Sequence, residues 1–301
     1  MAAVATAQIQ PSNSLFPTLS QDVSVPSTQP TKHDVEEGII DYLKPNEDGT
    51  PYKLDYHDLG TFLIPITSYK VKVHDITGDE DKFTLDNCGF QFVKHTTAEK
   101  DFVEYDHLKE GYYQETAELL KKVTGASRVF VYNHIIRNSN FEFDAAKFKE
   151  DNVRPPCQRI HADHSHNSGL GIVRTFLPDE AEELLKRRVQ IIHVWRPITM
   201  IERDPLVLAD HRFMPEEDLV ATPVEGPTLN GEICYVNYNP NHRWYYKYHL
   251  TPDEVIMFKA FDNLRDGRAE RAAHASCDVG AGPEVPPRRS VEVRAIVIHD
   301  D

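Results

Sequence analysis

Short runs of β-branched and aromatic residues, separated by turn residues, recur through most of this chain. The run at 290–298 is the most regular, with alternate residues directed to the two faces of an extended segment. Convincing helix signals are confined to residues 112–123 and 178–188. This distribution predicts a mainly β fold, an all-β barrel or jelly roll that carries a helical layer. Further strands are expected at residues 62–66, 69–73, 89–93, 128–134, 189–195, 233–238, 244–248 and 255–261.

Two local patterns carry further expectations. Residues 35–42 are compatible with a short helix. The turn sequence Asn-Pro-Asn at 239–241 is compatible with a hairpin between the strands expected at 233–238 and 244–248. Both expectations rest on local sequence alone.

The domain organisation is predicted from composition. Residues 1–33 are rich in Ser, Thr, Pro and Gln and are expected to form a disordered or loosely packed arm. Residues 34–301 are expected to form a single domain. The polar, irregular stretch 138–156 is an insertion within that domain, and its sequence fits either a lid over a site or a passive surface loop.

Charge and cysteine usage exclude several classes of function. A formal net charge of −15 argues against a broad surface for nucleic acid or anionic membranes. The chain has no run of eighteen apolar residues, so no membrane span is expected. The first ten residues lack a secretory signal, and the four cysteines are scattered without a C-x-x-C pair. These features predict a cytoplasmic protein with reduced thiols; they leave the oligomeric state open.

One short motif has the residue types of a metal site. In an extended segment, His161 and Asp163 project from the same face, while Ala162 points away. A His-x-Asp pair supplies two of the three ligands of the 2-His-1-carboxylate triad of non-haem Fe(II) oxygenases. The pair alone is a weak signal in a chain with 15 histidines, and a polar turn is the alternative.

A second histidine must come from a distant segment, and His274 is the favoured candidate because an arginine-serine pair stands shortly after it. Arg288 and Ser290 are two residues apart at the opening of the last strand, so they share a face. An arginine fork with a neighbouring hydroxyl is suited to the far carboxylate of a 2-oxo acid whose near end chelates iron. The other candidate histidines after the motif are His193, His211, His242, His249 and His299.

These motifs together resemble a known family. His-x-Asp, a distal His and Arg-x-Ser are similar to the Fe(II)/2-oxoglutarate oxygenases, and several longer blocks resemble the mostly fungal hydroxylase/desaturase family, grouped with gibberellin desaturase and a cephamycin methoxylation protein. The resemblance covers the chain from about residue 60 to its end. The blocks that carry it are Asn133–Arg137, Val194–Ile198, Arg203–Leu206, Lys259–Asp262 and Pro287–Arg294.

The resemblance implies a double-stranded β-helix, the cupin-like jelly roll, with flanking helices. It implies Fe(II) held by His161, Asp163 and His274, and 2-oxoglutarate anchored by Arg288 and Ser290. With O2 as the oxidant, such enzymes of secondary metabolism hydroxylate, desaturate or oxidatively cyclise a small molecule. A carboxylate-bearing substrate, an amino acid or a natural-product intermediate, is compatible with the arginines of this chain. The alternatives are a metal-dependent oxidase of the same barrel that does not use 2-oxoglutarate, and a non-catalytic binding protein.

Several other side chains are candidates for substrate binding. Arg196 could pair with a carboxylate of substrate or cosubstrate, or form a buried salt bridge with an acid such as Asp210. Arg174 could line the pocket or be an ordinary exposed arginine. His193 stands where the family usually has Asn, so it could alter the hydrogen bonding of the pocket. The remaining candidates end a strand at the expected mouth of the site and are Tyr132, Asn133 and Arg137.

Overall fold

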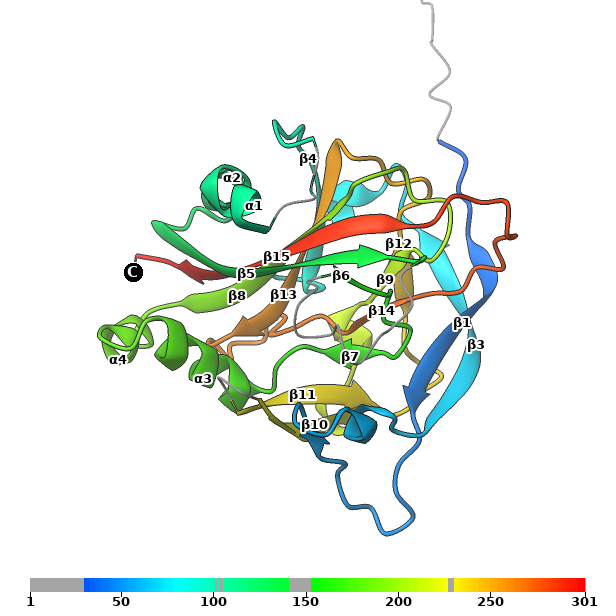
Figure 1. The fold of residues 1–301 in the computed structure, drawn as a ribbon, viewed down its shortest axis with the longest axis horizontal. Coiled ribbons are helices and arrows are strands. Elements are labelled where there is room, and N and C mark those ends of the chain that lie inside the picture. Colours follow the sequence, from blue (N-terminus) through cyan, green and yellow to red (C-terminus); the bar gives the residue numbers. More distant parts are fainter. Residues whose placement is uncertain (1–29, 101, 103–104, 141–152, 227–229, 301) are drawn as a thin grey trace, which may run out of the picture. The chain divides into compact units, whose positions relative to one another are not determined.

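The computed structural model describes residues 30–100, 102, 105–140, 153–226 and 230–300. Within these residues, strands predominate and form two sheets, between which the chain crosses repeatedly (Figure 1). No helix in these residues is long and apolar enough to cross a membrane. In spatial order, the larger sheet contains β1 (Val35–Leu43), β3 (Ile66–Asp75), β12 (Trp244–Tyr246), β9 (Leu206–Ala209), β14 (His274–Ser276), β7 (His161–Ala162), β11 (Gly231–Val236), β10 (Leu219–Glu225) and β2 (Leu54–Asp55).

The smaller sheet is centred on three long antiparallel strands whose residues are almost all buried. Such strands are rich in Val, Ile and Phe because both of their faces are covered. Four of the predicted strands, at 89–93, 128–134, 189–195 and 255–261, belong to this sheet and are confirmed within a few residues. In spatial order it contains β4 (Phe90–Lys94), β13 (Glu254–Asp262), β8 (Val189–Pro197), β15 (Arg289–Ile298), β5 (Arg128–Asn138) and β6 (Val153–Arg154).

The last strand, β15, separates an apolar layer from a polar one. It lies between β5 and β8 and pairs antiparallel with both. On its outer face, Val293 packs with Tyr112, and Val297 packs with Leu120; both partners belong to α2 (Tyr112–Thr124). Because side chains alternate along a strand, Ser290, Glu292 and Arg294 share the opposite face. This alternation places a row of polar groups between the two sheets.

The helices agree with the sequence only in part. The predicted helix at 112–123 is α2, which ends at Gly125 in the left-handed conformation with φ 72°. Along 178–188 only α4 (Ala181–Leu184) is α-helical. A longer helix, α3 (His166–Phe176), was not predicted; its N-cap Ser165 accepts a hydrogen bond from the Ser168 backbone N–H at 3.1 Å. A short helix, α1 (Tyr105–Glu110), precedes α2.

Glycine allows α3 to lie directly against the smaller sheet. A Cβ atom at Gly169 would stand 2.1 Å from Cδ2 of Phe261 in β13. Helix α3 also contacts β11 of the larger sheet. It therefore closes one end of the space between the sheets, directly after the His-x-Asp motif.

Three local predictions are wrong, and long-range pairing is the reason for the first and the third. Residues 35–42 form strand β1 rather than a helix, because pairing with β3 buries Ile40 and Tyr42. The strand expected at 62–66 is replaced by a 3-10 turn, Leu59–Phe62, and β3 begins only at Ile66. The hairpin between β11 and β12 does not form: β11 pairs with β10 and β7, and β12 pairs with β3 and β9.

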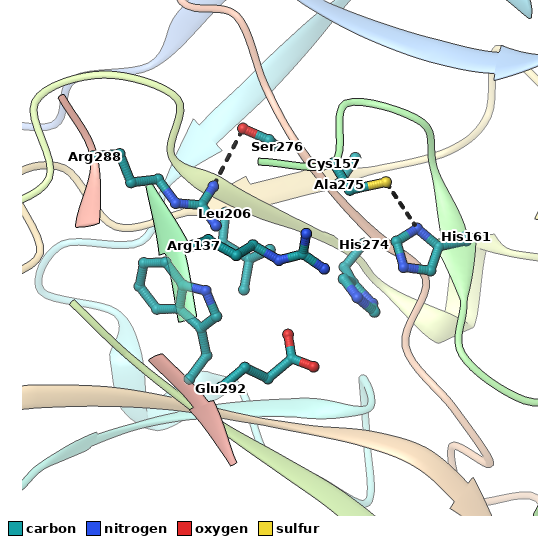
Figure 2. Close-up of a pocket in the computed structure, with 10 residues that line it drawn as sticks. Arg137, Cys157, His161, Leu206, His274, Ala275, Ser276, Arg288 and Glu292 are labelled. Atoms are coloured by element: carbon teal, nitrogen blue, oxygen red, sulfur yellow. Dashed lines mark hydrogen bonds between the residues drawn. The ribbon is translucent and has the colours of Figure 1, made fainter. Parts of the chain in front are cut away.

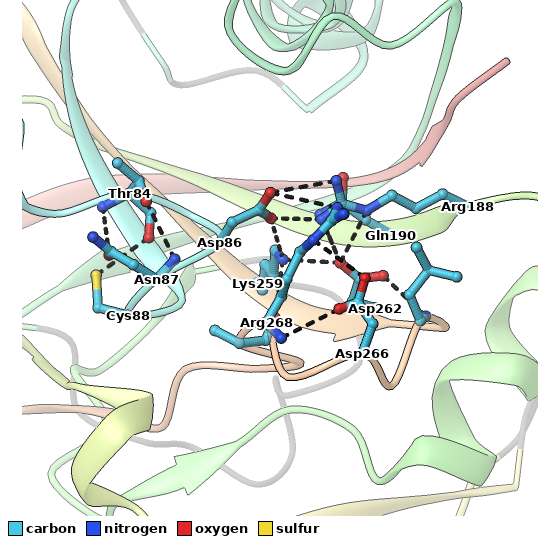
Figure 3. Close-up of polar contacts among 12 residues, drawn as sticks. Thr84, Asp86, Asn87, Cys88, Arg188, Gln190, Lys259, Asp262, Asp266 and Arg268 are labelled. Carbon is cyan, nitrogen blue, oxygen red and sulfur yellow. Dashed lines mark hydrogen bonds and ion pairs between the residues drawn. The ribbon is translucent and has the colours of Figure 1, made fainter. Parts of the chain in front are cut away.

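A charged network joins the start of β8 to the end of β13 (Figure 3). The Lys259 ammonium is fully buried and donates to Asp262 and to Asp86 at 2.8 Å each. Asp262 is 1% exposed and also accepts hydrogen bonds from Arg188 at 2.8 Å and Gln190 at 3.0 Å. A buried charge is tolerated only when it is paired and hydrogen-bonded, so Asp262 is the anion on which this network depends.

We expect Asp262→Asn to lower the free energy of unfolding by about 3 kcal/mol, because it leaves the buried Lys259 without its enclosed counter-charge. The matched control is Asp86→Asn, since the Asp86 side chain contacts the same cations but is 46% exposed; its loss should cost about 1 kcal/mol or less. Urea denaturation of the metal-free protein measures both. Equal losses in the two variants would show that burial does not decide the strength of this network.

Candidate functional site

Strand pairing brings two histidines together. Strand β7 lies between β11 and β14, and its His161 is the register partner of His274 at the start of β14. The two imidazole centroids are 4.5 Å apart. Asp163 comes directly after β7, and its Oδ2 lies 3.6 Å from Nε2 of His274. One ligand atom from each of these three side chains lies within 4.8 Å of the others, a spacing that fits one metal ion.

Backbone carbonyls orient both imidazoles. Nδ1 of His161 donates to the carbonyl of Arg159 at 2.9 Å, and Nδ1 of His274 donates to that of Ala272 at 3.2 Å. A proton on Nδ1 leaves the Nε2 lone pair free for a metal. Burial lowers the pKa of His274 to about 4, so this ring is neutral at physiological pH. Burial also acts to lower the pKa of His161, but Cys157 and Asp163 beside it raise the value to about 9, so metal binding there must displace a proton.

Asp163 sits in a ring of charged groups behind the histidines. Its Oδ1 is 3.4 Å from Nη2 of Arg294, and its Oδ2 is 3.4 Å from Nδ1 of His193. Burial acts to raise the pKa of Asp163, but His193, His274 and Arg294 hold it well below its ordinary value. Among the described residues, Oδ2 is buried without a hydrogen-bond partner. An ionised, buried oxygen beside two imidazoles, of which His274 is already neutral and His161 must lose a proton, is the donor set of a divalent cation.

Glu292 completes this ring. Its Oε1 lies 2.9 Å from Nη2 of Arg294 and 3.3 Å from Nδ1 of His193. Asp163, His193 and Glu292 thus form a second group of metal-ligand types with close ligand atoms. Here, however, the guanidinium of Arg294 already supplies the positive charge between the two carboxylates.

A guanidinium faces the histidines across the same cavity (Figure 2). Arg288 is 2% exposed and donates to the backbone carbonyl of Asp204 at 2.7 Å and to the hydroxyls of Ser276 and Ser290 at 3.2 and 3.3 Å. Its Cζ lies 5.1 Å from the ring centroid of Trp195. No carboxylate of the described residues lies within ion-pair distance of it. Burial, together with the positive charge of Arg137, lowers the pKa of Arg288 to about 9.

Two of the predicted substrate-binding residues do not reach the cavity. Arg196 is buried, but its guanidinium binds Tyr112 Oη, the Pro252 carbonyl, and both Nδ1 and the carbonyl of His95, at 2.6 to 2.8 Å. It therefore holds loops to the sheet, and it pairs neither with a cavity ligand nor with Asp210. Arg174 lies on the exposed side of α3 and pairs with Glu182 at 2.7 Å. These contacts favour the alternative readings, a buried structural role for Arg196 and an ordinary exposed arginine for Arg174, because the sequence does not show what lies opposite each strand or helix.

The other candidates lie on or near the inner face of the smaller sheet. Arg137 lines the cavity, and His193 touches Asp163. Tyr132 stacks on Phe176 of α3, with ring centroids 4.6 Å apart. Asn133 is the register partner of Arg294, and its Oδ1 accepts a hydrogen bond from the next backbone N–H.

Sequence reasoning missed Glu292 and Arg294. The signal was present, because the alternation that aligns Arg288 with Ser290 continues to positions 292 and 294 of the same strand. In the sequence, both residues stand out only as part of a family block. The structure shows that they surround Asp163 from the opposite sheet.

Comparison with known proteins decides the family. A family model described as an oxidoreductase/YMDC permease-like domain matches residues 40–298. The hydroxylase/desaturase efuI of Hormonema carpetanum is 33% identical, over 87% of this chain and 94% of its own length. The alpha-ketoglutarate-dependent dioxygenase tstK of Talaromyces stipitatus is 33% identical, over 89% of this chain and 99% of its own. The chain belongs to the hydroxylase/desaturase family of these relatives.

This membership in the fungal hydroxylase/desaturase family confirms the resemblance seen in the sequence. It also confirms the prediction that the chain is an iron- and 2-oxoglutarate-dependent oxidoreductase. The fold is confirmed by a solved structure of a variant of the iron and alpha-ketoglutarate-dependent endoperoxidase NvfI. That structure superposes with a TM-score of 0.78 at 22% identity, over 90% of this chain and 99% of the other. The sequence of the present chain predicted a mainly β jelly roll, and this superposition agrees with that prediction.

We expect Glu292→Gln to weaken divalent metal binding about tenfold, because it removes a negative charge and frees Arg294 to pair with Asp163 alone. Mn(II) titration of the metal-free protein, with free Mn(II) read by electron paramagnetic resonance, measures this. Glu254→Gln is the control, since that carboxylate pairs with Lys247 at the start of β13. Unchanged affinity in a folded Glu292→Gln variant would contradict the role given to this ring.

Proposed function

We propose that this chain is an Fe(II)/2-oxoglutarate-dependent oxygenase of secondary metabolism that hydroxylates, desaturates or oxidatively cyclises a small carboxylate-bearing substrate. One observation supports this most directly. A carboxylate oxygen of Asp163 lies within 4.8 Å of the ligand atoms of His161 and His274, and both histidines line a cavity with the buried Arg288, which has no carboxylate partner among the described residues. A divalent cation fits the first group, and a dicarboxylate that reaches from one group to the other fits both.

His161, Asp163 and His274 would hold Fe(II), which with the 2-oxo acid and O2 would supply the oxidising chemistry. Bound iron supplies the oxidation, in which 2-oxoglutarate is converted to succinate and carbon dioxide. The chain itself binds and orients. Arg288, with Ser290, would anchor the distal carboxylate of the cosubstrate through charge-assisted hydrogen bonds. Trp195 beside it provides an apolar wall that excludes water.

The alternative functions explain less of the cavity. A metal oxidase without a 2-oxo acid would leave the Arg288 guanidinium, buried and uncompensated, at a large free-energy cost. A non-catalytic binding protein has no need for ligand atoms at metal-binding distance. Stoichiometric release of succinate on substrate oxidation separates the proposed reaction from both.

The setting of the enzyme is also proposed. The cysteines are free thiols, which supports a cytoplasmic location. A single oxygenase domain from residue 34 onward is supported by the compact unit Thr31–Asp301. The chain just before it is anchored, since Lys32 donates to the carbonyl of Asp75 at 3.0 Å. Most of the proposed arm 1–33, and residues 141–152 of the proposed lid, lie outside the described residues.

The metal ligands can be tested by spectroscopy. Anaerobic addition of Fe(II) and 2-oxoglutarate should give a weak visible charge-transfer band, which His161→Ala and His274→Ala abolish while weakening Fe(II) binding about 100-fold or more. His107→Ala is the control, because that side chain is 61% exposed on α1. The proposal fails if both cavity variants keep the band and the Fe(II) affinity of the wild type.

The cosubstrate anchor can be tested by its concentration dependence. Arg288→Met should raise the 2-oxoglutarate concentration for half-maximal succinate release about 100-fold, since two charge-assisted hydrogen bonds are worth about 3 kcal/mol. Arg289→Met is the control, because the neighbouring side chain leaves the strand on its other face. An equal requirement for 2-oxoglutarate in wild type and Arg288→Met would rule out this role.

A further inference from the structure

A second arginine enters the same cavity from β5. Arg137 is the register partner of Ser290 across the pairing of β5 and β15, so the two side chains leave the sheet on the same face. It lines the cavity with Arg288, His161, and His274. Figure 2 shows its guanidinium directed away from the strand toward His274, on the side of the cavity where the metal ligands lie.

Arg137 has little to bind within the protein. Its Nη1 donates to the carbonyl of Pro155 at 2.8 Å. No carboxylate in the described part of the chain lies within ion-pair distance of it. The acid that lines this cavity, Glu292, is already paired with Arg294. Most donors of this guanidinium therefore remain for a ligand.

A count of charges indicates which ligand that is. Glu292 and Arg294 cancel each other, and Asp163 cancels one of the two positive charges of Fe(II). A doubly charged 2-oxoglutarate then cancels the other charge of the metal and that of Arg288. With the Cys157 thiol and the His161 ring both counted as neutral, one positive charge remains, on the half-buried Arg137, where an unbalanced charge is costly.

We propose that Arg137 binds a carboxylate of the organic substrate and so selects acids over their neutral analogues. This inference rests on the proposed function, because it assumes that iron and 2-oxoglutarate occupy the rest of the cavity. A planar fork that faces the metal ligands would hold a carboxylate in two parallel hydrogen bonds. The carbon skeleton attached to that carboxylate would then lie beside the metal, where its C–H bonds are oxidised.

The test uses a minimal probe, because any acid presents the same group. Anaerobic protein saturated with Fe(II) and 2-oxoglutarate is titrated with propionate and with propionamide, its neutral isostere, and the binding heat and the charge-transfer band are followed. Wild type should prefer propionate, and Arg137→Met should bind it about tenfold more weakly, since a charge-assisted pair is lost. Arg137→Lys, which keeps the charge without the fork, should lose less. Propionamide binding should be the same in all three.

The affinity for 2-oxoglutarate identifies the source of the carboxylate. An unchanged 2-oxoglutarate affinity in Arg137→Met, together with weaker propionate binding, supports the proposal. A fall in 2-oxoglutarate affinity like that of Arg288→Met assigns Arg137 to the cosubstrate and overturns it, as does propionate binding that Arg137→Met leaves unchanged. Arg289→Met and thermal unfolding control for folding. Absence of the charge-transfer band in wild type would refute the proposed function itself, which keeps the two failures distinct.

Discussion

The register of β7 against β14 is the constraint on which the rest of the site depends. Because His161 and His274 are direct cross-strand partners, their imidazoles are held 4.5 Å apart by main-chain hydrogen bonds rather than by side-chain contacts. A slip of one residue would turn either histidine to the other face of the sheet. Both strands are short, and they are held in place by β11 on one side and β9 on the other. Strand pairing in the larger sheet therefore fixes the positions of His161 and His274 relative to each other.

The smaller sheet supplies the polar groups that the proposed metal ligands face. Four alternate positions near and along β15, from Arg288 to Arg294, point to the same side, and β5 and β8 add Arg137 and His193 next to them. The larger sheet thus carries the proposed metal ligands His161 and His274, and the smaller sheet carries the charged side chains that surround them. Helix α2 covers the outer face of β15, so the same alternation stabilises the fold and builds the site.

The sequence predicted what is periodic or local. The alternating strands, the helix that ends at Gly125, and the His-x-Asp and Arg-x-Ser pairs can each be recognised within a short stretch of sequence. The family resemblance then indicated that the two pairs belong to one site. It could not predict which strand pairs with which. The false hairpin of β11 and β12 and the helix expected at β1 failed because the strands that pair with them, such as β7 and β3, lie elsewhere in the chain, and the contacts of Arg196 come from residues 56 to 101 positions away. Helix α3 begins shortly after the His-x-Asp motif and was missed because its first turns contain Gly169 and Gly171, residues that disfavour helices.

The position of Arg294 has a consequence for the nuclearity of the site. Asp163, His193 and Glu292 offer the ligand types of a second ion, and Asp163 belongs to both groups. A guanidinium that never loses its proton occupies the electrostatic role of that second ion. The chain thereby carries its own permanent counter-ion beside Asp163, which would leave His161, Asp163 and His274 as the group open to a single cation.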